Sequence, residues 1–302
     1  MNIAVLGGNG FLGTNTVEEI AKSHVVCVIS NRRNENQVKN VKYYTVDIVE
    51  TDKLLNIFVK EKIDCIIHFV STLIPSSNSE EYICDIETVY IGTFKLLAYC
   101  AEKKIKFVYI SSGGAIYGKN GENKINENTN LAPISFYGLS KLMIEELILF
   151  FHRTQQLNYL IVRPSNPYGR GQNLNGRQGV IAVFLGKILK KEKLQIWGDG
   201  NHRKDYIYIS DFVYYLNTLI NSTNLWNEAY NIGSGKLYTV NDIINEIKRT
   251  CIDDFEVEYI DKKKTDVEDI YFDVSKIQNI IAHKCLSLSV GLKEFWRNLN
   301  EQ

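Results

Sequence analysis

The chain has 302 residues, 45% hydrophobic and 23% charged, which is enough for a large globular core. Lysine plus arginine and aspartate plus glutamate number 35 each, so no bulk charge favours nucleic acid or an anionic membrane as a partner. No apolar run approaches the roughly 20 residues of a transmembrane helix, and the N-terminus has no signal-peptide pattern. Six scattered cysteines without metal-type spacing predict reduced thiols, no metal site and a cytoplasmic protein.

Short apolar runs alternate with helical patterns in the first half of the chain. The runs predict buried strands, which read in chain order NIAVLG, HVVCVIS, DCIIHFV, FVYISS and YLIVRPS. Helical patterns lie between them, near residues 14–22, 53–59, 83–102 and 137–153. Strands without a polar face are typical of a parallel sheet covered by helices on both sides. The sequence therefore predicts an α/β fold of the Rossmann type, with a doubly wound parallel sheet.

The pattern changes after Arg163. A loop-like segment rich in Gly and Asn, NPYGRGQNLNGRQG, is followed by smaller elements, among them LQIWGDG, DYIYISDFVYYLNTLI and FEVEYI. We predict a dinucleotide-binding Rossmann domain over residues 1–165. A smaller α/β substrate domain is expected over residues 166–302, with residues 206–229 returning to the first domain.

A glycine-rich motif, GGNGFLG, connects the first predicted strand to the first predicted helix. Its glycines allow a tight turn, close approach of a pyrophosphate and close packing of the helix, whose N-terminus offers free N–H groups to the anion. The alternative is a plain strand-to-helix turn. The position directly after an N-terminal strand favours a dinucleotide site, formed by Gly7, Gly10, Phe11, Leu12 and Gly13.

The end of the second strand indicates which cofactor is used. NAD-binding domains usually place a carboxylate here for the ribose hydroxyls, whereas this turn offers Asn31, Arg32 and Arg33. Two guanidinium groups suit a 2′-phosphate, so NADP(H) is favoured and NAD is the other possibility. A solvated basic turn is the structural alternative. Asp47 and Ile48, at the end of YYTVDI, are expected to lie beside the adenine.

A tyrosine and a lysine form the candidate catalytic pair. Tyr137 and Lys141, in YGLSK at a helix start, are four residues apart and so lie on one helical face. A lysine ammonium stabilises a tyrosinate, so we expect Lys141 to lower the pKa of Tyr137 toward that of a working acid/base. The spacing recurs elsewhere in the chain. Only this pair follows a strand end that carries hydroxyl groups, in FVYISSGG.

Six motifs in chain order resemble those of a known enzyme family. GGNGFLG, SSGGAIYG, YGLSK, RPSNPYG, WGDGNHRKDYIYISD and YNIGSG are similar to motifs of the extended short-chain dehydrogenase/reductases that act on nucleotide sugars. The resemblance covers nearly the whole chain. It implies a Rossmann domain, a C-terminal sugar-nucleotide domain, a nucleoside-diphosphate sugar as substrate and a homodimer.

The resemblance also exposes a departure at the catalytic strand end. The position where relatives carry a catalytic Ser or Thr is Gly113, so the hydroxyl is missing there. We expect Ser112, one residue earlier, to replace it; the alternative is that the serines only cap backbone groups. Dehydratases of the family carry an Asp-Glu pair where this chain has Gly114 and Ala115. A 4,6-dehydratase is therefore not expected.

Other binding residues follow from the resemblance alone, and ordinary loop or core polarity is the alternative for each. They are Asn166 and either Arg203 or Lys204 at the diphosphate, Gln195 and Trp197 at the nucleotide base, and Phe69 and Pro164 at the cofactor.

Two redox reactions at carbon 4 of the sugar remain open, together with a non-catalytic role. A 4-ketoreductase uses dissociable NADPH to reduce a 4-keto-6-deoxy sugar nucleotide, whereas a 4-epimerase keeps NAD bound and returns the hydride to the other face. A non-catalytic, NADP-sensing regulator of the same fold is the third possibility. The basic turn at residues 31–33 favours the reductase.

Overall fold

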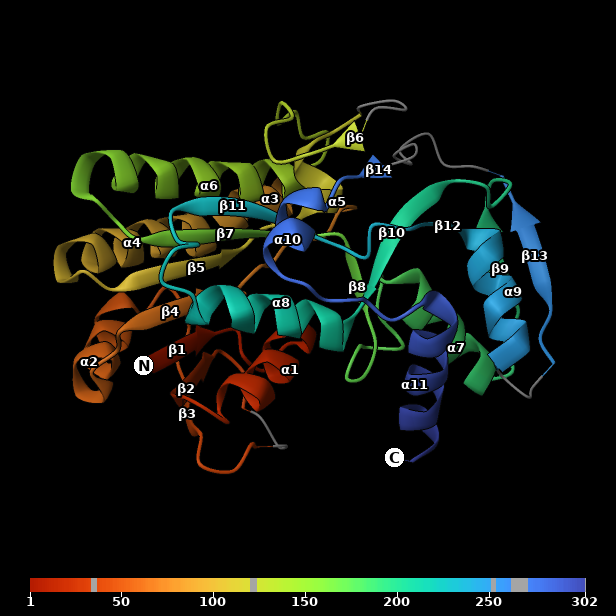
Figure 1. The fold of residues 1–302 in the computed structure, drawn as a ribbon, viewed down its shortest axis with the longest axis horizontal. Coiled ribbons are helices and arrows are strands. Elements are labelled where there is room, and N and C mark those ends of the chain that lie inside the picture. Colours follow the sequence, from red (N-terminus) through yellow and green to blue (C-terminus); the bar gives the residue numbers. More distant parts are fainter. Residues whose placement is uncertain (34–36, 120–123, 251–253, 262–270, 302) are drawn as a thin grey trace.

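A seven-stranded parallel sheet forms the centre of the molecule (Figure 1). The computed structural model describes residues 1–33, 37–119, 124–250, 254–261 and 271–301. All neighbouring strands of this sheet are parallel, and their order is β11-β7-β5-β4-β1-β2-β3. The strands are β1 (Asn2–Leu6), β2 (Val25–Ser30), β3 (Lys42–Thr45), β4 (Cys65–His68), β5 (Lys106–Ile110), β7 (Tyr159–Pro164) and β11 (Glu228–Ile232). The sheet confirms the predicted Rossmann-type α/β fold.

Helices cover both faces of this sheet because its strands alternate between two apolar surfaces. Ile3 and Val5 of β1 pack in one buried cluster with residues of α1 and α8, whereas Ala4 and Leu6 pack in a second cluster with residues of α2, α4 and α6. Figure 1 shows the two helical layers on opposite sides of the strands. The helices are α1 (Phe11–Ile20), α2 (Thr51–Glu61), α4 (Ile91–Lys103), α6 (Phe136–Gln155) and α8 (Ile209–Asn221).

A second set of smaller elements lies beyond the carboxyl ends of the central strands (Figure 1). β8 (Asn166–Tyr168), β10 (Arg203–Tyr208) and β12 (Leu237–Thr239) form a three-stranded sheet. β9 pairs with β13, and β6 pairs with β14. The remaining elements are α3 (Ser79–Asp85), the π-helical turn η1 (Ile86–Tyr90), α5 (Gly113–Ile116), β6 (Lys124–Ile125), α7 (Val180–Leu189), β9 (Leu194–Trp197), α9 (Val240–Thr250), β13 (Val257–Ile260), β14 (Tyr271–Phe272), α10 (Ser275–Ile280) and α11 (Leu288–Asn300).

The chain crosses between the two parts more than once. β10 belongs to the three-stranded sheet, so residues 203–208 lie with the smaller part. The next helix, α8, packs on α1, and β11 then pairs with β7 at the edge of the central sheet. Residues 209–232 therefore lie with the Rossmann sheet, a segment that overlaps the predicted return over residues 206–229.

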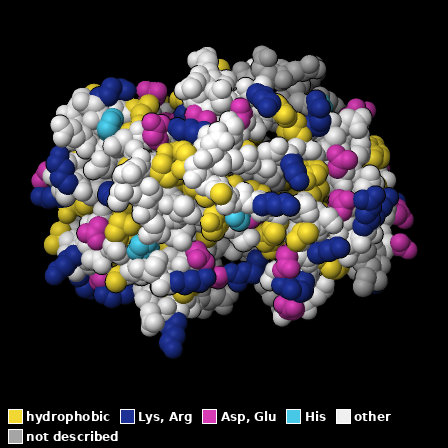
Figure 2. Space-filling model, viewed as in Figure 1, with side chains coloured by type: hydrophobic (Ala, Val, Ile, Leu, Met, Phe, Trp, Pro, Cys, Tyr) yellow, Lys and Arg dark blue, Asp and Glu magenta, His cyan; other side chains and the backbone are white. Residues whose placement is uncertain are grey.

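The surface carries both signs of charge in mixture. Figure 2 shows basic and acidic side chains interspersed over the viewed face, and the chain carries 35 residues of each sign. Within the described residues, no helix is both long enough and apolar enough to cross a membrane. Cys27, Cys65 and Cys100 are buried free thiols, whereas Cys84 is exposed; Cys251 lies outside the described residues.

Candidate active site

The carboxyl ends of the parallel strands bring the predicted site residues to one edge of the sheet. The glycine-rich loop follows β1, the basic turn follows β2, Phe69 follows β4, and the SSGG segment follows β5. Pro164 ends β7, which is the strand next to β5. In open α/β sheets, this edge is where ligands bind.

The glycine-rich loop has the geometry of a dinucleotide cradle. Gly7 has a φ of 75°, a conformation that L side chains rarely adopt, and a Cβ on Gly13 would lie 2.6 Å from the Gly7 carbonyl oxygen. Gly10 caps α1 without a side chain, so the first N–H groups of the helix face the loop. Asn9 Oδ1 is buried without a hydrogen-bond partner among the described residues. These features fit the pyrophosphate of a nicotinamide dinucleotide.

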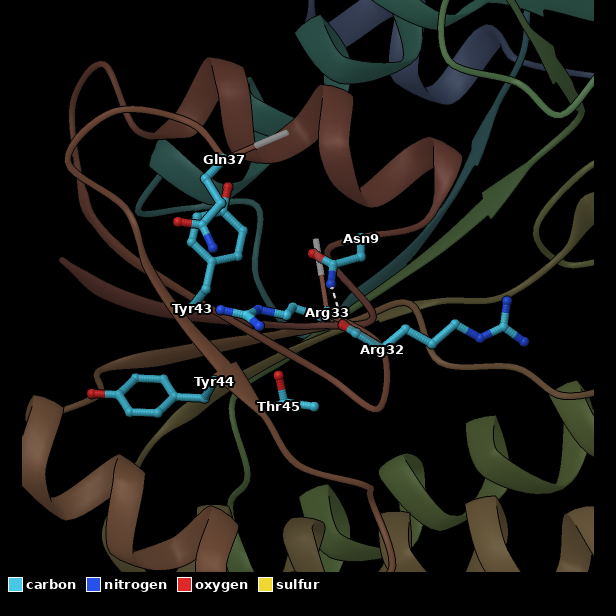
Figure 3. A pocket seen from close by; sticks show the side chains of 7 residues that line it. All are labelled: Asn9, Arg32, Arg33, Gln37, Tyr43, Tyr44 and Thr45. Atoms are coloured by element: carbon cyan, nitrogen blue, oxygen red, sulfur yellow. Dashed lines mark hydrogen bonds between the residues drawn. The ribbon is translucent and has the colours of Figure 1, made fainter. Parts of the chain in front are cut away.

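The basic turn lines a pocket of about 410 Å³ beside the glycine-rich loop (Figure 3). Asn9 Nδ2 donates to the Arg32 carbonyl oxygen at 2.7 Å, which fixes the turn against the loop. Figure 3 shows the Arg33 side chain extending toward Tyr43 and Gln37, whereas the Arg32 side chain extends in the opposite direction. Both arginines are exposed and able to reach an anion.

The residues predicted at the adenine lie next to this turn. Asn31 Nδ2 donates to Asp47 Oδ2 at 3.3 Å, which joins the ends of β2 and β3. Ile48 is buried, and a Cβ on Gly92 would lie 2.9 Å from its Cγ1, so α4 approaches closely here. Phe69 is half-buried, and its N–H donates to the Leu6 carbonyl oxygen at 2.9 Å. The predicted cofactor residues therefore surround one region of the strand edge.

Close packing of two helices places Tyr137 beside the SSGG segment. Ser135 caps α6 by accepting from the Gly138 N–H at 3.1 Å. A Cβ on Gly138 would lie 2.4 Å from the Ala115 carbonyl oxygen, so only glycine allows α5 and α6 to approach this closely. Gly138 of YGLSK was not predicted as a site residue from the sequence. Its role is to let the two helices pack this closely.

Ser112 is the hydroxyl that reaches Tyr137. It occupies the N-cap position of the four-residue helix α5, but its side chain makes no capping hydrogen bond. Burial raises the pKa of the Tyr137 phenol, and the neighbouring Ser112 hydroxyl lowers it. The backbone-cap alternative for Ser112 therefore does not describe this geometry, whereas Ser111 Oγ is buried without a partner among the described residues.

Lys141 is almost completely buried and is bonded to the backbone of β5. Its side chain is buried, and Nζ donates to the Ile110 carbonyl oxygen at 2.9 Å. Nζ lies 5.8 Å from the centroid of the Tyr137 ring. The pKa of the Tyr137 phenol is raised, with burial as the largest cause, so the expected lowering by Lys141 stays a prediction. Burial lowers the pKa of Lys141 itself to about 8.

An aromatic ring occupies the place of the missing hydroxyl. A Cβ on Gly113 would lie 2.2 Å from Cζ of Phe272 and 3.1 Å from the Pro164 carbonyl oxygen. Phe272, on β14, is 4% exposed and cannot turn into solvent without opening the core. Glycine at position 113 is therefore required by the packing of Phe272. A Cβ on the neighbouring Gly114 meets no atom within 4 Å.

The residues predicted at the sugar nucleotide lie on two different sheets. Asn166, Arg203 and Lys204 belong to the three-stranded sheet, where Asn166 Nδ2 donates to the Asp205 carbonyl oxygen at 2.7 Å. Arg203 is exposed and Lys204 is half-buried. Gln195 and Trp197 are exposed on β9, in the separate β9–β13 pair. The structure thus groups the diphosphate candidates and leaves the base candidates apart from them.

Sequence reasoning missed one buried carboxylate near the catalytic pair and one cluster of potential metal ligands at α8. Asp85 accepts a hydrogen bond from Ser140, the residue that precedes Lys141. Asp211, His283 and Cys285 place one potential metal ligand each within 4.8 Å of one another. The Asp211 carboxylate already accepts from the Leu286 N–H at 2.9 Å and bonds His283 at 2.7 Å, so this cluster ties the C-terminal segment to α8.

The sheet and the Tyr137–Lys141 site define an extended short-chain dehydrogenase/reductase. The profile of the NAD dependent epimerase/dehydratase family matches residues 3–233, and the chain belongs to that family. Its cofactor is a nicotinamide dinucleotide. The family consists of enzymes, so membership favours an enzyme over the non-catalytic regulator.

Three relatives show how similar the chain is to other proteins of this kind. A putative UDP-glucose 4-epimerase of Methanocaldococcus jannaschii is 31% identical over 296 residues, 96% of each chain. A dTDP-4-dehydro-6-deoxyglucose reductase of Escherichia coli is 31% identical over 258 residues, 82% of this chain and 80% of the relative. The structure of a UDP-glucose 4-epimerase of Thermotoga maritima with UDP-glucose has a TM-score of 0.93 at 31% identity, covering 100% of this chain and 99% of the other.

Replacing the two glycines separately tests the packing argument. Gly113→Ala should lower the free energy of unfolding by about 1–3 kcal/mol, because an extra methyl group is forced against a buried ring. Gly114→Ala, the matched control, should change it by less than about 0.5 kcal/mol, because its site is open. Urea unfolding measures both values. Equal losses, or a larger loss at Gly114, would show that Phe272 does not determine the residue at position 113.

Proposed function

We propose that the protein is an NADPH-dependent 4-ketoreductase of a nucleoside-diphosphate 4-keto-6-deoxyhexose. The observation that carries this proposal is the basic turn: Arg32 and Arg33 line the pocket next to the glycine-rich loop, where NAD-specific domains place a carboxylate. The reductase of Escherichia coli, which is 31% identical, supports the same reaction class. The absence of carboxylate side chains at Gly114 and Ala115 favours this reaction over a dehydration.

The proposed reduction assigns one role to each catalytic side chain. NADPH, when bound, supplies the hydride that reduces carbon 4. Tyr137 gives its phenolic proton to the oxygen at carbon 4, so the ketone becomes an alcohol. Burial, which raises the pKa of this phenol, keeps the proton on Tyr137 at neutral pH until the reaction. Ser112 donates to the reacting oxygen, and Lys141 binds the ribose of the cofactor.

The sugar nucleotide is proposed to bind across the smaller part of the molecule. Asn166 with Arg203 or Lys204 would hold the diphosphate, since these residues share one sheet and two of them are cationic. Gln195 and Trp197 would contact the base from β9, where both side chains are exposed. Trp197 offers the large flat face on which a base stacks.

A 4-epimerase with bound NAD is the second candidate. The relatives from Methanocaldococcus jannaschii and Thermotoga maritima support it, because both carry the name of a UDP-glucose 4-epimerase and align over almost the whole chain. The same residues would serve in this reaction. Tyr137 would first accept the proton from the sugar hydroxyl and then return it.

A direct assay separates the two reactions and tests the acid/base. Purified protein should contain no tightly held cofactor and should consume NADPH with dTDP-4-keto-6-deoxyglucose. Tyr137→Phe should lower turnover by about 10²–10⁴, the usual contribution of general acid catalysis, with folding intact. Co-purified NAD together with interconversion of UDP-glucose and UDP-galactose would refute the reductase in favour of the epimerase.

Cofactor choice depends on the arginines. Arg32→Ala/Arg33→Ala should weaken NADPH binding by roughly ten- to a hundredfold, because a charge-assisted hydrogen bond contributes about 1.5–3 kcal/mol. NADH binding should hardly change. Titration calorimetry with both cofactors gives the ratio, and the single variants show which arginine contacts the phosphate. Equal losses for NADPH and NADH would mean that the turn does not distinguish them.

We also propose that the chain forms a homodimer through α4 and α6. Ile91 and Phe94 of α4 and Phe150 of α6 are large apolar side chains exposed by 44%, 46% and 48%. The rings of Phe94 and Phe150 lie 5.6 and 5.7 Å from that of Phe151, so the exposed residues form one apolar patch. Two copies related by a twofold axis would cover this patch with a bundle of four helices.

A charge placed in the patch tests this association. Phe94→Asp should convert a dimer into a monomer, because a carboxylate would be buried without a partner. Val59→Asp is the matched control, since Val59 on α2 is 66% exposed outside the patch and its replacement should leave the mass unchanged. Light scattering after gel filtration measures the mass. A monomeric parent protein, or a dimeric Phe94→Asp variant, would contradict the proposal.

A further inference from the structure

The ammonium group of Lys141 is held in an unusually enclosed place. The side chain is 4% exposed, and Nζ donates to the Ile110 carbonyl oxygen at 2.9 Å. Nζ also lies 4.9 Å from the centroid of the Tyr109 ring. One carbonyl oxygen and an aromatic face do not replace the hydration that a buried ammonium loses. The charged form of Lys141 therefore needs a nearby anion.

Two carboxylates, Asp85 and Glu145, raise the pKa of Lys141, and Glu145 already forms an ion pair with another cation. Glu145 is fully buried and binds Arg163 through both of its oxygens, with Nη2–Oε2 and Nε–Oε1 distances of 2.6 and 3.2 Å. Arg163 lies next to Glu145 and opposes part of the effect of this carboxylate on a third charge. Glu145 accordingly raises the pKa of Lys141 less than Asp85 does.

The other carboxylate, Asp85, is buried among neutral donors. It is 1% exposed at the end of α3, directly before the π-helical turn η1. Its Oδ1 accepts from Thr72 Oγ1 at 2.5 Å and its Oδ2 from Ser140 Oγ at 2.6 Å. Two hydroxyl groups hold the carboxylate in place without cancelling its charge. π-Helical turns occur frequently at functional sites.

The remaining groups around Lys141 carry no compensating negative charge at neutral pH. His68 is fully buried, and burial together with Lys141 lowers its pKa to about 3, so the ring is neutral. Tyr109 is a neutral phenol, because burial raises its pKa well above the ordinary value. Tyr137 is likewise neutral. Among the described residues near Lys141, Asp85 is the anion that is not paired with Arg163.

We propose that Asp85 is a positioning residue for catalysis, fixed by Thr72 and Ser140 so that its charge keeps the Lys141 side chain in the ammonium form. This inference rests on the proposed function for its catalytic consequence, since a neutral Lys141 would bind the cofactor ribose less well. The pKa of Lys141 is lowered by burial and raised first by Asp85 and then by Glu145, which agrees with this assignment.

Titration of Lys141 in Asp85→Asn tests the proposal without any substrate. Carbon-13-labelled lysine reports each side chain by NMR, and Lys141→Arg identifies the Lys141 signal by its loss. In the parent protein Lys141 is charged below a midpoint of about 8 and neutral above it. Loss of the anion should move this midpoint down by at least about one pH unit, because an opposite charge nearby typically shifts a pKa by 1–3 units.

Matched variants separate charge from hydrogen bonding. Thr72→Val and Ser140→Ala each remove one hydrogen bond to Asp85 and keep its charge, so the midpoint should move by less than about 0.5 unit. Asp85→Ser removes the charge in a second way and should lower the midpoint as Asp85→Asn does, a result that remains informative if Asp85→Asn does not fold. An unchanged midpoint in either Asp85 variant, or an equal shift in Ser140→Ala, would overturn the proposal.

The loss of the Asp85 charge also predicts the direction in which the pH profile of activity shifts. The basic limb of the pH profile of kcat/KM should move to lower pH in Asp85→Asn by the shift seen in the titration, whereas Thr72→Val should keep the parent profile. If the titration shifts as expected but no reduction or epimerisation occurs in the parent protein, the proposed function fails and the assignment of Asp85 stands. A shifted titration with an unshifted activity limb would overturn the catalytic part of the inference.

Discussion

The buried ion pair between Glu145 and Arg163 holds the catalytic helix on the parallel sheet, and the geometry of the site depends on it. Glu145 belongs to α6, which also carries Tyr137 and Lys141, while Arg163 belongs to β7. Arg163 also donates to the Tyr117 hydroxyl at 2.8 Å, just after the SSGG segment. Such a pair adds little net stability, because desolvation offsets the attraction, but breaking it costs about 3–5 kcal/mol. The pair therefore determines the position of α6 on the sheet and adds little to the free energy of unfolding.

A second buried carboxylate gives the smaller part of the molecule its place relative to this helix. Asp205 of β10 accepts from Ser165 Oγ at 2.6 Å and from the N–H groups of Ser234 and Gly235 at 2.9 and 2.6 Å. Ser165 follows β7, and the other two residues follow β11, so one side chain joins the small sheet to two strands of the central one. Asn166 and the cationic residues of β10 are thereby fixed against the edge where Tyr137 lies.

The sequence was sufficient where a function is encoded in neighbouring residues. The glycine-rich loop and the Tyr137–Lys141 spacing depend on a few consecutive positions, so their locations could be predicted. The contact of Phe272 with Gly113 joins residues far apart in the chain, and no local pattern indicates it. Asp85 likewise reaches the site from another helix. The i,i+4 spacing shows that Tyr137 and Lys141 share a helical face, but it does not show that Lys141 is buried and donates to the Ile110 carbonyl oxygen.

The packing of Phe272 on Gly113 has a chemical consequence for the proposed reduction. With no side chain at position 113, the expected hydroxyl is that of Ser112, which already lowers the pKa of the Tyr137 phenol. A serine hydroxyl has one proton to donate. When Ser112 turns this proton toward the oxygen at carbon 4, the phenol loses the hydrogen bond that lowers its pKa. In an oxidation, which needs the tyrosinate, that loss opposes the reaction. In the proposed reduction the phenol keeps its proton until transfer, so one hydroxyl can serve Tyr137 before the reaction and the reacting oxygen during it.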